Sequence, residues 1–331
     1  MSNDQLYREI GKSGVKASAV GLGTWAIGGW MWGGTDEKQS IEAIRASLDA
    51  GITLIDTAPA YGLGNTERIV GEAIKGRRED AVIATKCGLV WHTNKGNYFF
   101  TQDDKPVHRY LGKDSIIHEV EESLKRLQTD YIDLYITHWQ DATTPIEETV
   151  AALDELKRSG KIRAIGASNV NETELQAYIK TGKLDAIQER FSMIDREIET
   201  TLLPLAIPNS VATLSYSSLA LGLLSGKIDP KREFSGDDQR KDNPRFSQKN
   251  REKVLEFANS INGIAESHEA TIAQVVIAWT LTKPGVTFAL CGARDVKQAE
   301  ENAAAGRIRL TDQERQSIDA SIKQHLSNLD E

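Results

Sequence analysis

An alternation of short apolar segments with helical segments, repeated eight times, most constrains how this 331-residue chain can fold. Short apolar segments are typical of strands buried on both faces of a parallel sheet. Because helices separate the strands, right-handed crossovers are expected, and eight units favour a closed (β/α)8 TIM barrel of the α/β class over an open sheet of about six strands. The predicted strands are Ala19–Gly23, Ile52–Ile55, Ala81–Thr85, Ile132–Ile136, Ile162–Gly166, Ala186–Gln188, Val211–Ser215 and Val286–Leu290.

The segments between these strands carry helix signals. Thr35 is the expected N-cap of one helix, and two later helices begin with capping boxes, Thr144 with Glu147 and Asn171 with Glu174. Apolar residues then recur on one face of each helix, as in helices that pack on a sheet. The further helix predictions are Asp36–Ala50, Asp114–Gln128, Asn250–His268 and Ile272–Leu281.

Three features lie outside this regular pattern. Leu6–Ile10 and Val15–Ser18 predict a β-hairpin that closes the N-terminal end of the barrel. Two long polar insertions, His92–Lys113 and Lys227–Asn250, follow the third and seventh strands, where βα loops form the catalytic face, so we expect them to act as lids. No linker or change of composition is evident, and a single domain over residues 1–331 is therefore expected.

Composition and charge exclude several classes of partner and location. The 40 Lys and Arg against 48 Asp and Glu give a net charge of −8, which argues against nucleic acid and anionic membranes as partners. No apolar run is long enough for a transmembrane helix, and the first nine residues lack the apolar core of a secretory signal. Two distant cysteines, Cys87 and Cys291, form no disulfide framework. A cytoplasmic protein is expected.

Four polar residues lie at or just after the ends of neighbouring predicted strands. Asp56 closes the second strand with Tyr61 five residues later, Lys86 closes the third, and His138 ends the fourth. Each has an ordinary alternative: a turn aspartate, a tyrosine in loop packing, a histidine satisfied in the core. Lys86 is harder to dismiss, because a buried lysine needs a partner or loses its charge. Together, the four indicate one site above the barrel.

These residue types favour proton donation to a carbonyl oxygen. Lys86, kept cationic by Asp56, is expected to stabilise the Tyr61 phenolate and to lower the Tyr61 pKa from about 10. Tyr61 then acts as a general acid, and His138 donates a hydrogen bond to the same oxygen. No nucleophile with an adjacent base and no metal-ligand cluster is evident. The arrangement suits carbonyl reduction by an external source of hydride.

Motifs spread over the whole chain resemble those of the aldo-keto reductase family. The similarity is closest to its bacterial general-stress-type and glyceraldehyde-reducing members, whose long first loop resembles Trp30-Met-Trp-Gly-Gly34. The other matching motifs are Gly21-Leu-Gly-Thr-Trp25, Asp56-Thr-Ala-Pro-Ala-Tyr61-Gly62, Ala84-Thr-Lys86, Thr137-His138-Trp139, Gly160-Lys-Ile-Arg-Ala-Ile-Gly-Ala-Ser168-Asn169 and Tyr216-Ser-Ser-Leu-Ala-Leu-Gly-Leu-Leu-Ser-Gly-Lys227.

The resemblance implies a function and a set of site residues. Asp56, Tyr61, Lys86 and His138 become the catalytic tetrad of an NADPH-dependent oxidoreductase that reduces aldehydes or ketones, with short hydroxyaldehydes such as glyceraldehyde as plausible substrates. The implied cofactor-binding residues are Gly23, Thr24, Trp25, Asp56, Ser168, Asn169, Gln188, Tyr216, Ser217, Leu219, Gly222, Lys227, Gly292, Arg294, Gln298, Glu301 and Asn302. The expected substrate pocket comprises Trp25, Trp30, Trp32, Tyr61, Trp91, His138 and Trp139.

The resemblance also assigns parts of the cofactor to these residues. Ser168, Asn169 and Gln188 are expected at the carboxamide and Tyr216 on the nicotinamide ring, with the stretch from Ser217 to Lys227 along the pyrophosphate. The residues from Gly292 to Asn302 are expected to bind the adenosine end of the cofactor. Within that group, Arg294 is placed at the opening of the last helix, where its planar guanidinium suits a 2′-phosphate. Outside the resemblance, a solvated helix arginine is an equal alternative.

Two other functions compete with this interpretation. Gly21-Leu-Gly-Thr-Trp-Ala26 fits a dinucleotide-binding fingerprint with Asp56 as its ribose acid. However, Trp25 to Gly34 separate these glycines from the next helix, so the helix cannot direct its N-terminus at the phosphates. The second alternative is a non-catalytic NADPH-binding subunit of the same fold that regulates potassium channels. The intact tetrad favours an enzyme, while the sequence leaves the oligomeric state open.

Overall fold

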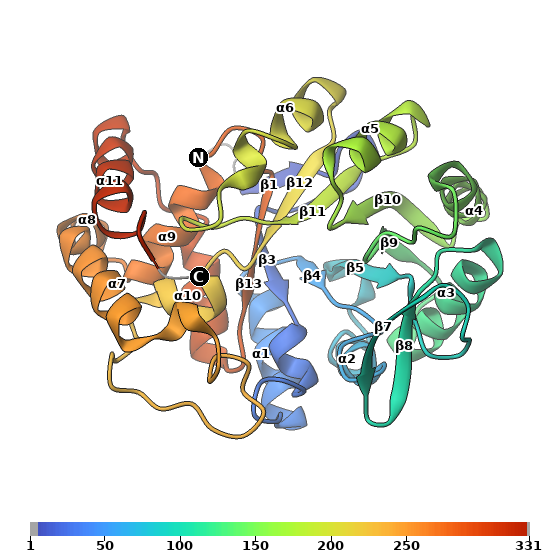
Figure 1. The fold of residues 1–331 in the computed structure, drawn as a ribbon, viewed down its shortest axis with the longest axis horizontal. Coiled ribbons are helices and arrows are strands. Elements are labelled where there is room, and N and C mark those ends of the chain that lie inside the picture. Colours follow the sequence, from blue (N-terminus) through green and yellow to red (C-terminus); the bar gives the residue numbers. More distant parts are fainter. Residues whose placement is uncertain (1–5, 330–331) are drawn as a thin grey trace.

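Eight parallel strands close into a barrel in the computed structural model, which describes residues 6–329 (Figure 1). The first strand pairs with the last, so the sheet has no open edge. All eight predicted strands and the TIM-barrel class are confirmed, with bounds that differ by a residue or two. The strands are β3 (Val20–Gly23), β4 (Leu54–Asp56), β5 (Val82–Cys87), β9 (Ile132–Thr137), β10 (Ile162–Ser168), β11 (Ala186–Arg190), β12 (Ala212–Tyr216) and β13 (Phe288–Gly292).

The inside of the barrel is filled by apolar side chains. Leucines such as Leu54 and Leu134 alternate with alanines from neighbouring strands, and all are buried. Gly21 leaves room for these leucines, because a Cβ at this position would lie 2.6 Å from a Leu290 methyl carbon. The predicted hairpin is confirmed as β1 (Tyr7–Glu9) and β2 (Lys16–Ser18), and its Ala17 belongs to the same buried cluster.

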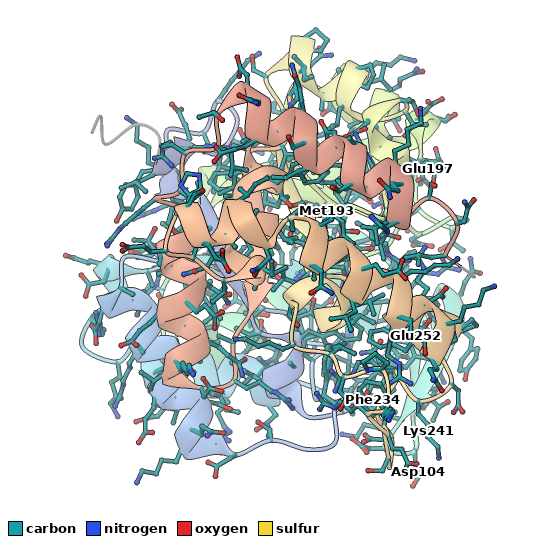
Figure 2. The ribbon with its side chains drawn as sticks, turned by 90° about the vertical axis from the view of Figure 1, so that its left-hand side faces the viewer. Asp104, Met193, Glu197, Phe234, Lys241 and Glu252 are labelled. Carbon is teal, nitrogen blue, oxygen red and sulfur yellow. The ribbon has the colours of Figure 1, made fainter. Side chains whose placement is uncertain are left out.

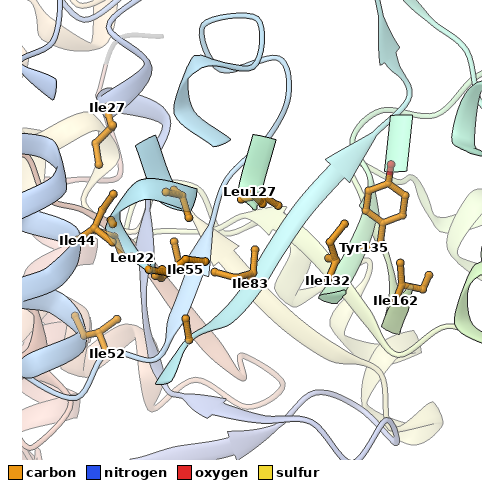
Figure 3. Close-up of a cluster of buried hydrophobic side chains, with 14 of the residues drawn as sticks. Leu22, Ile27, Ile44, Ile52, Ile55, Ile83, Leu127, Ile132, Tyr135 and Ile162 are labelled. Atoms are coloured by element: carbon orange, nitrogen blue, oxygen red, sulfur yellow. The ribbon is translucent and has the colours of Figure 1, made fainter. Parts of the chain in front are cut away.

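Helices cover the outside of the barrel. Outward residues of the strands, such as Leu22 and Ile83, pack against helix residues such as Ile44 and Leu127 (Figure 3). Each buried aliphatic side chain of this kind contributes about 2 kcal/mol. The helices are α1 (Glu37–Asp49), α2 (Asn65–Ala73), α3 (Lys113–Leu127), α4 (Ile146–Arg158), α5 (Glu172–Lys180), α6 (Leu203–Ala206), α7 (Gln248–Ser260), α8 (Asn262–Ser267), α9 (Ile272–Leu281), α10 (Val296–Ala305) and α11 (Asp312–His325).

Two of the predicted helix caps are wrong. Asp36, not Thr35, caps α1, because its carboxylate accepts from the Gln39 backbone N–H. The capping box at Thr144 is absent, since the Thr144 hydroxyl donates to Asp141 Oδ2 at 2.7 Å. At α1 the Asp36 carboxylate, a stronger acceptor than a hydroxyl, makes the cap contact, whereas no side chain caps α4.

The remaining helix predictions have mixed outcomes. The capping box of Asn171 and Glu174 is confirmed at α5. The predicted helix Asn250–His268 is instead two helices, α7 and α8, which meet at Ile261, where the backbone leaves the helical region. Helices α2 and α11 were not among the explicit predictions.

The two insertions differ in structure. Residues 97–109 form an antiparallel hairpin of β7 (Asn97–Gln102) and β8 (Lys105–Arg109), and β6 (Leu89–Val90) pairs with β8. We call these three strands the inserted sheet. The second insertion is mostly irregular, with one short 3-10 turn, Pro244–Phe246. Both lie along the lower edge of the molecule in Figure 1.

Within residues 6–329, no helix is long and apolar enough to cross a lipid bilayer. The expectation that the N-terminus carries no secretory signal falls partly on residues 1–5, which lie outside the described residues.

Candidate active site

Lys86 is the centre of the candidate site. Its ammonium group donates to both Asp56 carboxylate oxygens, at 2.8 and 3.0 Å, and to the Thr57 carbonyl at 2.8 Å. The Tyr61 hydroxyl oxygen lies 3.2 Å from the same nitrogen. An ammonium group can only donate, so the Tyr61 oxygen accepts from Lys86 and the Tyr61 proton is left for another acceptor. The geometry therefore leaves the Tyr61 proton available to an acceptor other than Lys86.

Burial shifts the pKa of both groups. It raises the pKa of Tyr61 well above its usual value, and the Asp56 charge adds to this effect. Burial also lowers the pKa of Lys86, while Asp56 opposes that change. The expectation that Lys86 lowers the Tyr61 pKa is thus wrong for the free protein, because desolvation of the phenolate outweighs the cation.

His138 directly follows β9 and faces Tyr61. Its backbone N–H donates to the Cys87 carbonyl at 2.8 Å, and its ring centre lies 5.8 Å from that of Tyr61. Its Nδ1 is buried and lacks a hydrogen-bond partner within residues 6–329. Burial, with Lys86 nearby, lowers the pKa of His138 well below its usual value. A neutral imidazole with a free ring nitrogen can orient a carbonyl oxygen.

The strand register explains why these residues meet. Asp56 pairs with Ala84 across β4 and β5, and Lys86 pairs with Ile136 across β5 and β9. Parallel neighbours in one barrel bring their carboxyl-terminal ends to the same rim. The structure therefore brings the four predicted catalytic residues together, while their catalytic roles stay predictions.

Ser168 and Gln188 adjoin the same carboxylate. The Gln188 side-chain amide donates to Asp56 Oδ1 at 2.7 Å. The Ser168 hydroxyl donates to the Gln188 carbonyl, also at 2.7 Å. Both side chains are buried. Thr24 is also buried, and its hydroxyl donates to the Asp56 backbone carbonyl at 2.8 Å.

Asn169 forms hydrogen bonds with His138 and with Tyr216, the residue expected at the nicotinamide ring. Its amide nitrogen donates to the His138 carbonyl at 2.8 Å, and its amide oxygen accepts from the Tyr216 hydroxyl at 2.7 Å. The Asn169 backbone is left-handed, with φ 56°. Sequence reasoning missed the residue that supports this turn: Glu189 is buried and accepts from the Val170 N–H at 3.0 Å. An acidic residue directly after the predicted strand Ala186–Gln188 was the available signal.

The backbone after β12 is shaped unusually. Ser217, Ala220 and Leu221 have φ of 58°, 46° and 56°, a region that side chains other than glycine rarely adopt. Leu219 lies within this bend, and Gly222 continues it at φ 90°. Strained backbone of this kind gathers at ligand sites. The stretch expected along the pyrophosphate therefore fits a bound ligand.

The expected adenosine-end residues contact one another. The Lys227 ammonium pairs with Glu301 at 2.6 Å, and the second Glu301 carboxylate oxygen is buried without a hydrogen-bond partner within residues 6–329. The Asn302 amide donates to the carbonyl of Gly292, at the end of β13, at 3.1 Å. A buried unpaired oxygen beside a lysine offers hydrogen-bonding capacity to a polar ligand.

Arg294 lies just outside a helix. It precedes Asp295, the N-cap of α10, so it lies at the opening of a helix as predicted, although α11 follows and α10 is not the last helix. Its side chain is exposed, with one long contact of 3.5 Å to the Trp32 carbonyl. Gln298 accepts from the Arg294 N–H at 3.2 Å. An exposed guanidinium in this position is available to a phosphate.

The first loop supplies part of an aromatic wall. Trp25 lies next to Gly23 and Thr24 at the end of β3, and its ring stacks on Tyr61 with centres 6.3 Å apart. Trp32 meets Trp25 edge-on at 5.6 Å.

The inserted sheet supplies the rest of the wall. Trp30 stacks on Phe100 at 5.3 Å, and Trp139 contacts Phe99 at 5.4 Å. Trp91 packs in the same aromatic cluster, which also contains the fully buried Val107 of β8. The predicted pocket residues are thus brought to one end of the barrel. Phe99 and Phe100 were missed as wall residues, although their aromatic run in a polar insertion was visible.

Comparison with known proteins places this arrangement in a family. Residues 19–323 match the model described as "Aldo/keto reductase family". The chain is 43% identical to "Aldo-keto reductase YhdN" of Bacillus subtilis, over 97% of this chain and 95% of that protein. It is 42% identical to "NADH-specific methylglyoxal reductase" of Escherichia coli, over 92% and 94% of the two chains.

Solved structures show the same likeness. The glycerol dehydrogenase AKR11B4 from Gluconobacter oxydans superposes with a TM-score of 0.88 at 36% identity, covering 99% of this chain and 98% of that one. An aldo-keto reductase from Klebsiella pneumoniae, solved in complex with NADPH, has a TM-score of 0.71 at 30% identity and covers 97% of both chains.

Proposed function

The chain belongs to the aldo/keto reductase family, and from this premise we propose that it reduces aldehydes to alcohols with NADPH, with Tyr61 as the proton donor. It is an oxidoreductase of carbonyl and alcohol groups that uses a nicotinamide cofactor, as its relatives and structural neighbours are. The observation that carries the proposal is the contact between Lys86 and Tyr61, which occupies the tyrosine oxygen and leaves its proton free.

The other catalytic residues assist this transfer. Asp56 holds the Lys86 ammonium in place through two short contacts. Neutral His138 donates a hydrogen bond to the carbonyl oxygen and directs it toward Tyr61. The bound nicotinamide supplies the hydride. Proton donation from a positioned side chain of this kind accelerates a reaction by about 10²–10⁴-fold.

Three groups of residues hold the cofactor in this proposal. The carboxamide end would be held by Ser168, Asn169 and Gln188, with Tyr216 on the nicotinamide ring. The bend from Ser217 to Gly222 follows the phosphates. The adenosine end is held by Lys227, Gly292, Arg294, Gln298, Glu301 and Asn302. Arg294 favours NADPH over NADH, a preference that requires a test because one relative is described as NADH-specific.

We also propose a short hydroxyaldehyde such as glyceraldehyde as substrate, and a cytoplasmic location for a single domain over residues 1–331. The tryptophans around Tyr61 support a small substrate, since they narrow the space above the carbonyl site. Cys87 and Cys291 are free and buried, which suits a reducing compartment.

The proposal is tested by Tyr61→Phe, which keeps the ring and removes the acid. We expect the kcat for glyceraldehyde reduction, followed by NADPH absorbance, to fall by about 10²–10⁴-fold. The NADPH dissociation constant, followed by fluorescence, should change by less than about twofold. Tyr98→Phe, an exposed tyrosine of the inserted sheet, is the matched control and should keep full activity. Full activity in Tyr61→Phe contradicts the proposed mechanism.

A further inference from the structure

A second pocket adjoins the proposed carbonyl site. It has a volume of about 360 Å³, and its lining includes Asn97, Arg109, Trp139, Gln140, Asn169 and Glu174. Two of these residues belong to the site already described. Trp139 directly follows His138, and the Asn169 amide donates to the His138 carbonyl at 2.8 Å. The pocket therefore lies where the part of a substrate remote from its carbonyl can extend.

The inserted sheet turns Arg109 toward the barrel. Arg109 is in β8, the central strand, and pairs with Leu89 on one side and Asn97 on the other. Alternate residues of a strand face the same side. Val107, two residues earlier, is fully buried in the aromatic cluster over the barrel, so Arg109 shares that face. Its guanidinium lies over the Phe99 ring, 4.8 Å from the ring centre.

Arg109 is a cation without a counter-charge. Its Nε is buried, and its guanidinium has neither a hydrogen bond nor an ion pair within residues 6–329. Arg126, which is also part-buried, has such a partner, because it contacts Glu67 at 2.6 Å. A partly buried charge without a partner is unfavourable, and contact with an aromatic face offsets only part of that cost. The position is thus suited to an anion that binds from outside.

The remaining lining is compatible with such an anion. The only carboxylate among the pocket residues, Glu174, is held in the capping box of α5, where it accepts from the Asn171 N–H at 2.8 Å, and it makes no ion pair with Arg109. The Gln140 amide donates to the Ser168 carbonyl at 3.0 Å and is also satisfied. Arg109 therefore holds the unused hydrogen-bond donors that matter for recognition of a charged group.

We propose that Arg109 binds an acidic end group, carboxylate or phosphate, of an aldehyde whose carbonyl lies at Tyr61 and His138. This inference rests on the proposed function and names the class of substrate for the same site. The planar guanidinium can meet either group with two parallel hydrogen bonds, which a lysine cannot.

Two matched pairs of aldehydes test the inference. Butanal and succinic semialdehyde differ by a carboxylate, and glyceraldehyde and glyceraldehyde phosphate differ by a phosphate. We expect the wild-type protein to have a higher kcat/KM for the acidic member of at least one pair. Arg109→Gln should lower kcat/KM for that acidic aldehyde by about ten- to hundredfold, because a charge-assisted contact is lost. The neutral partner should change by less than about threefold.

Further variants show whether a loss of kcat/KM in Arg109→Gln comes from lost binding of the acidic group, from the change of net charge or from loss of folding. Lys105→Gln removes an exposed charge from the same face of β8 at the hairpin end, and should leave both kcat/KM values unchanged. Arg109→Lys keeps the charge and should show an intermediate loss for the acidic aldehyde. Activity of each variant toward the neutral aldehyde reports that the protein is folded.

The results distinguish the two levels of the proposal. If the wild-type protein reduces none of the four aldehydes with NADPH or NADH, the proposed function fails. The wild-type protein can instead reduce the neutral aldehydes and show no higher kcat/KM for the acidic ones. If Arg109→Gln then also leaves the kcat/KM of the acidic aldehydes relative to their neutral partners unchanged, only the Arg109 inference is overturned. Equal loss of all activity in both Arg109 variants also overturns it, because Arg109 is then needed for the fold alone.

Discussion

Burial and the Asp56 charge have opposite effects on the pKa of Lys86 but the same effect on the pKa of Tyr61. Desolvation lowers the pKa of Lys86 and raises that of Tyr61, while the Asp56 carboxylate favours the protonated form of both. The pair of Asp56 and Lys86 carries no net charge, so it cannot make the phenolate favourable in the free protein. Tyr61 consequently keeps its proton through neutral and mildly alkaline pH, which is the state that carbonyl reduction requires.

Cofactor choice is decided at Arg294 in the proposed function. We expect Arg294→Ala to raise the KM for NADPH by about ten- to hundredfold, because a charged hydrogen bond to the 2′-phosphate is lost. The KM for NADH should change by less than about twofold. Steady-state kinetics with both cofactors make the measurement, and Arg307→Ala, an exposed arginine beyond the end of α10, serves as control. An equal change with both cofactors removes the phosphate role.

Position relative to strand ends made some site residues predictable. Asp56, Lys86 and His138 follow apolar segments at one rim, so residue type and place in the sequence sufficed to group them. Glu189 and Arg109 did not stand out in the same way. Their surroundings depend on contacts with the Asn169 turn and with Phe99, and such contacts appear only when distant segments are folded together.

Helix α3 is tied to the turn that follows β5. Glu119 of α3 is buried and accepts from the Gly88 N–H at 2.9 Å and from the Ser115 hydroxyl at 3.0 Å. Gly88 requires its positive φ of 90° and has no room for a side chain, since a Cβ would lie 2.4 Å from a Leu111 methyl carbon. Burial raises the pKa of Glu119 to about 8. The contact between α3 and the turn after β5 thus depends on a titratable side chain, Glu119.

This group makes stability depend on pH. The folded state holds the Glu119 proton up to pH about 8, whereas an unfolded glutamate loses it near 4.5. The folded protein binds the extra proton between these values, so the free energy of unfolding falls as pH rises through that window. Glu119→Gln cannot titrate, and its urea-unfolding free energy should fall less steeply, by up to about 1 kcal/mol per pH unit.

Glu122→Gln is the control on the same helix. Lys125 lowers the pKa of Glu122, so this substitution should not flatten the slope between pH 5 and 8. Identical slopes for the wild-type protein and Glu119→Gln show that Glu119 is not the group that titrates.

The barrel elements were predictable because both the apolar strands and the amphipathic helices leave periodic patterns. The inserted sheet left none: β7 is half-exposed, and a bulge between Tyr98 and Phe100 breaks its alternation. Cap positions failed for a local reason. At α1 the Asp36 carboxylate caps the helix in place of the neighbouring threonine, and at α4 the Thr144 hydroxyl donates to Asp141 and does not cap the helix; a sequence pattern shows neither contact.

Three segments far apart in sequence join over the catalytic end of the whole molecule. The first loop meets the inserted sheet through Trp30 and Phe100, and meets the second insertion through Asp237. In Figure 2, Phe234 and Lys241 of the second insertion lie at the same lower edge as Asp104, the tip of the β7–β8 hairpin. The positions of both insertions followed from barrel topology. The connection of the two insertions through the first loop did not follow from the topology, because it depends on side-chain contacts between irregular segments.

Asp237 fastens the second insertion to the first loop. Its two carboxylate oxygens accept from the backbone N–H groups of Met31 and Gly33 at 3.0 and 3.1 Å, and the Gln239 N–H returns a bond to the Met31 carbonyl at 3.1 Å. Hydrogen bonds to a charged acceptor contribute about 1.5–3 kcal/mol when shielded and less when exposed, as here. Loss of this carboxylate should therefore free the insertion locally without unfolding the barrel.

Limited trypsin digestion measures that release. We expect Asp237→Ala to increase the rate of cleavage after Lys241 and its neighbouring basic residues by several fold, because cleavage requires the segment to open locally. The melting temperature should change little, since the barrel core is untouched. Glu233→Ala removes an exposed carboxylate from the same insertion, away from Lys241, and should leave the rate of cleavage after Lys241 unchanged. Equal cleavage rates for Asp237→Ala and the wild-type protein mean that the aromatic contacts hold the insertion without Asp237.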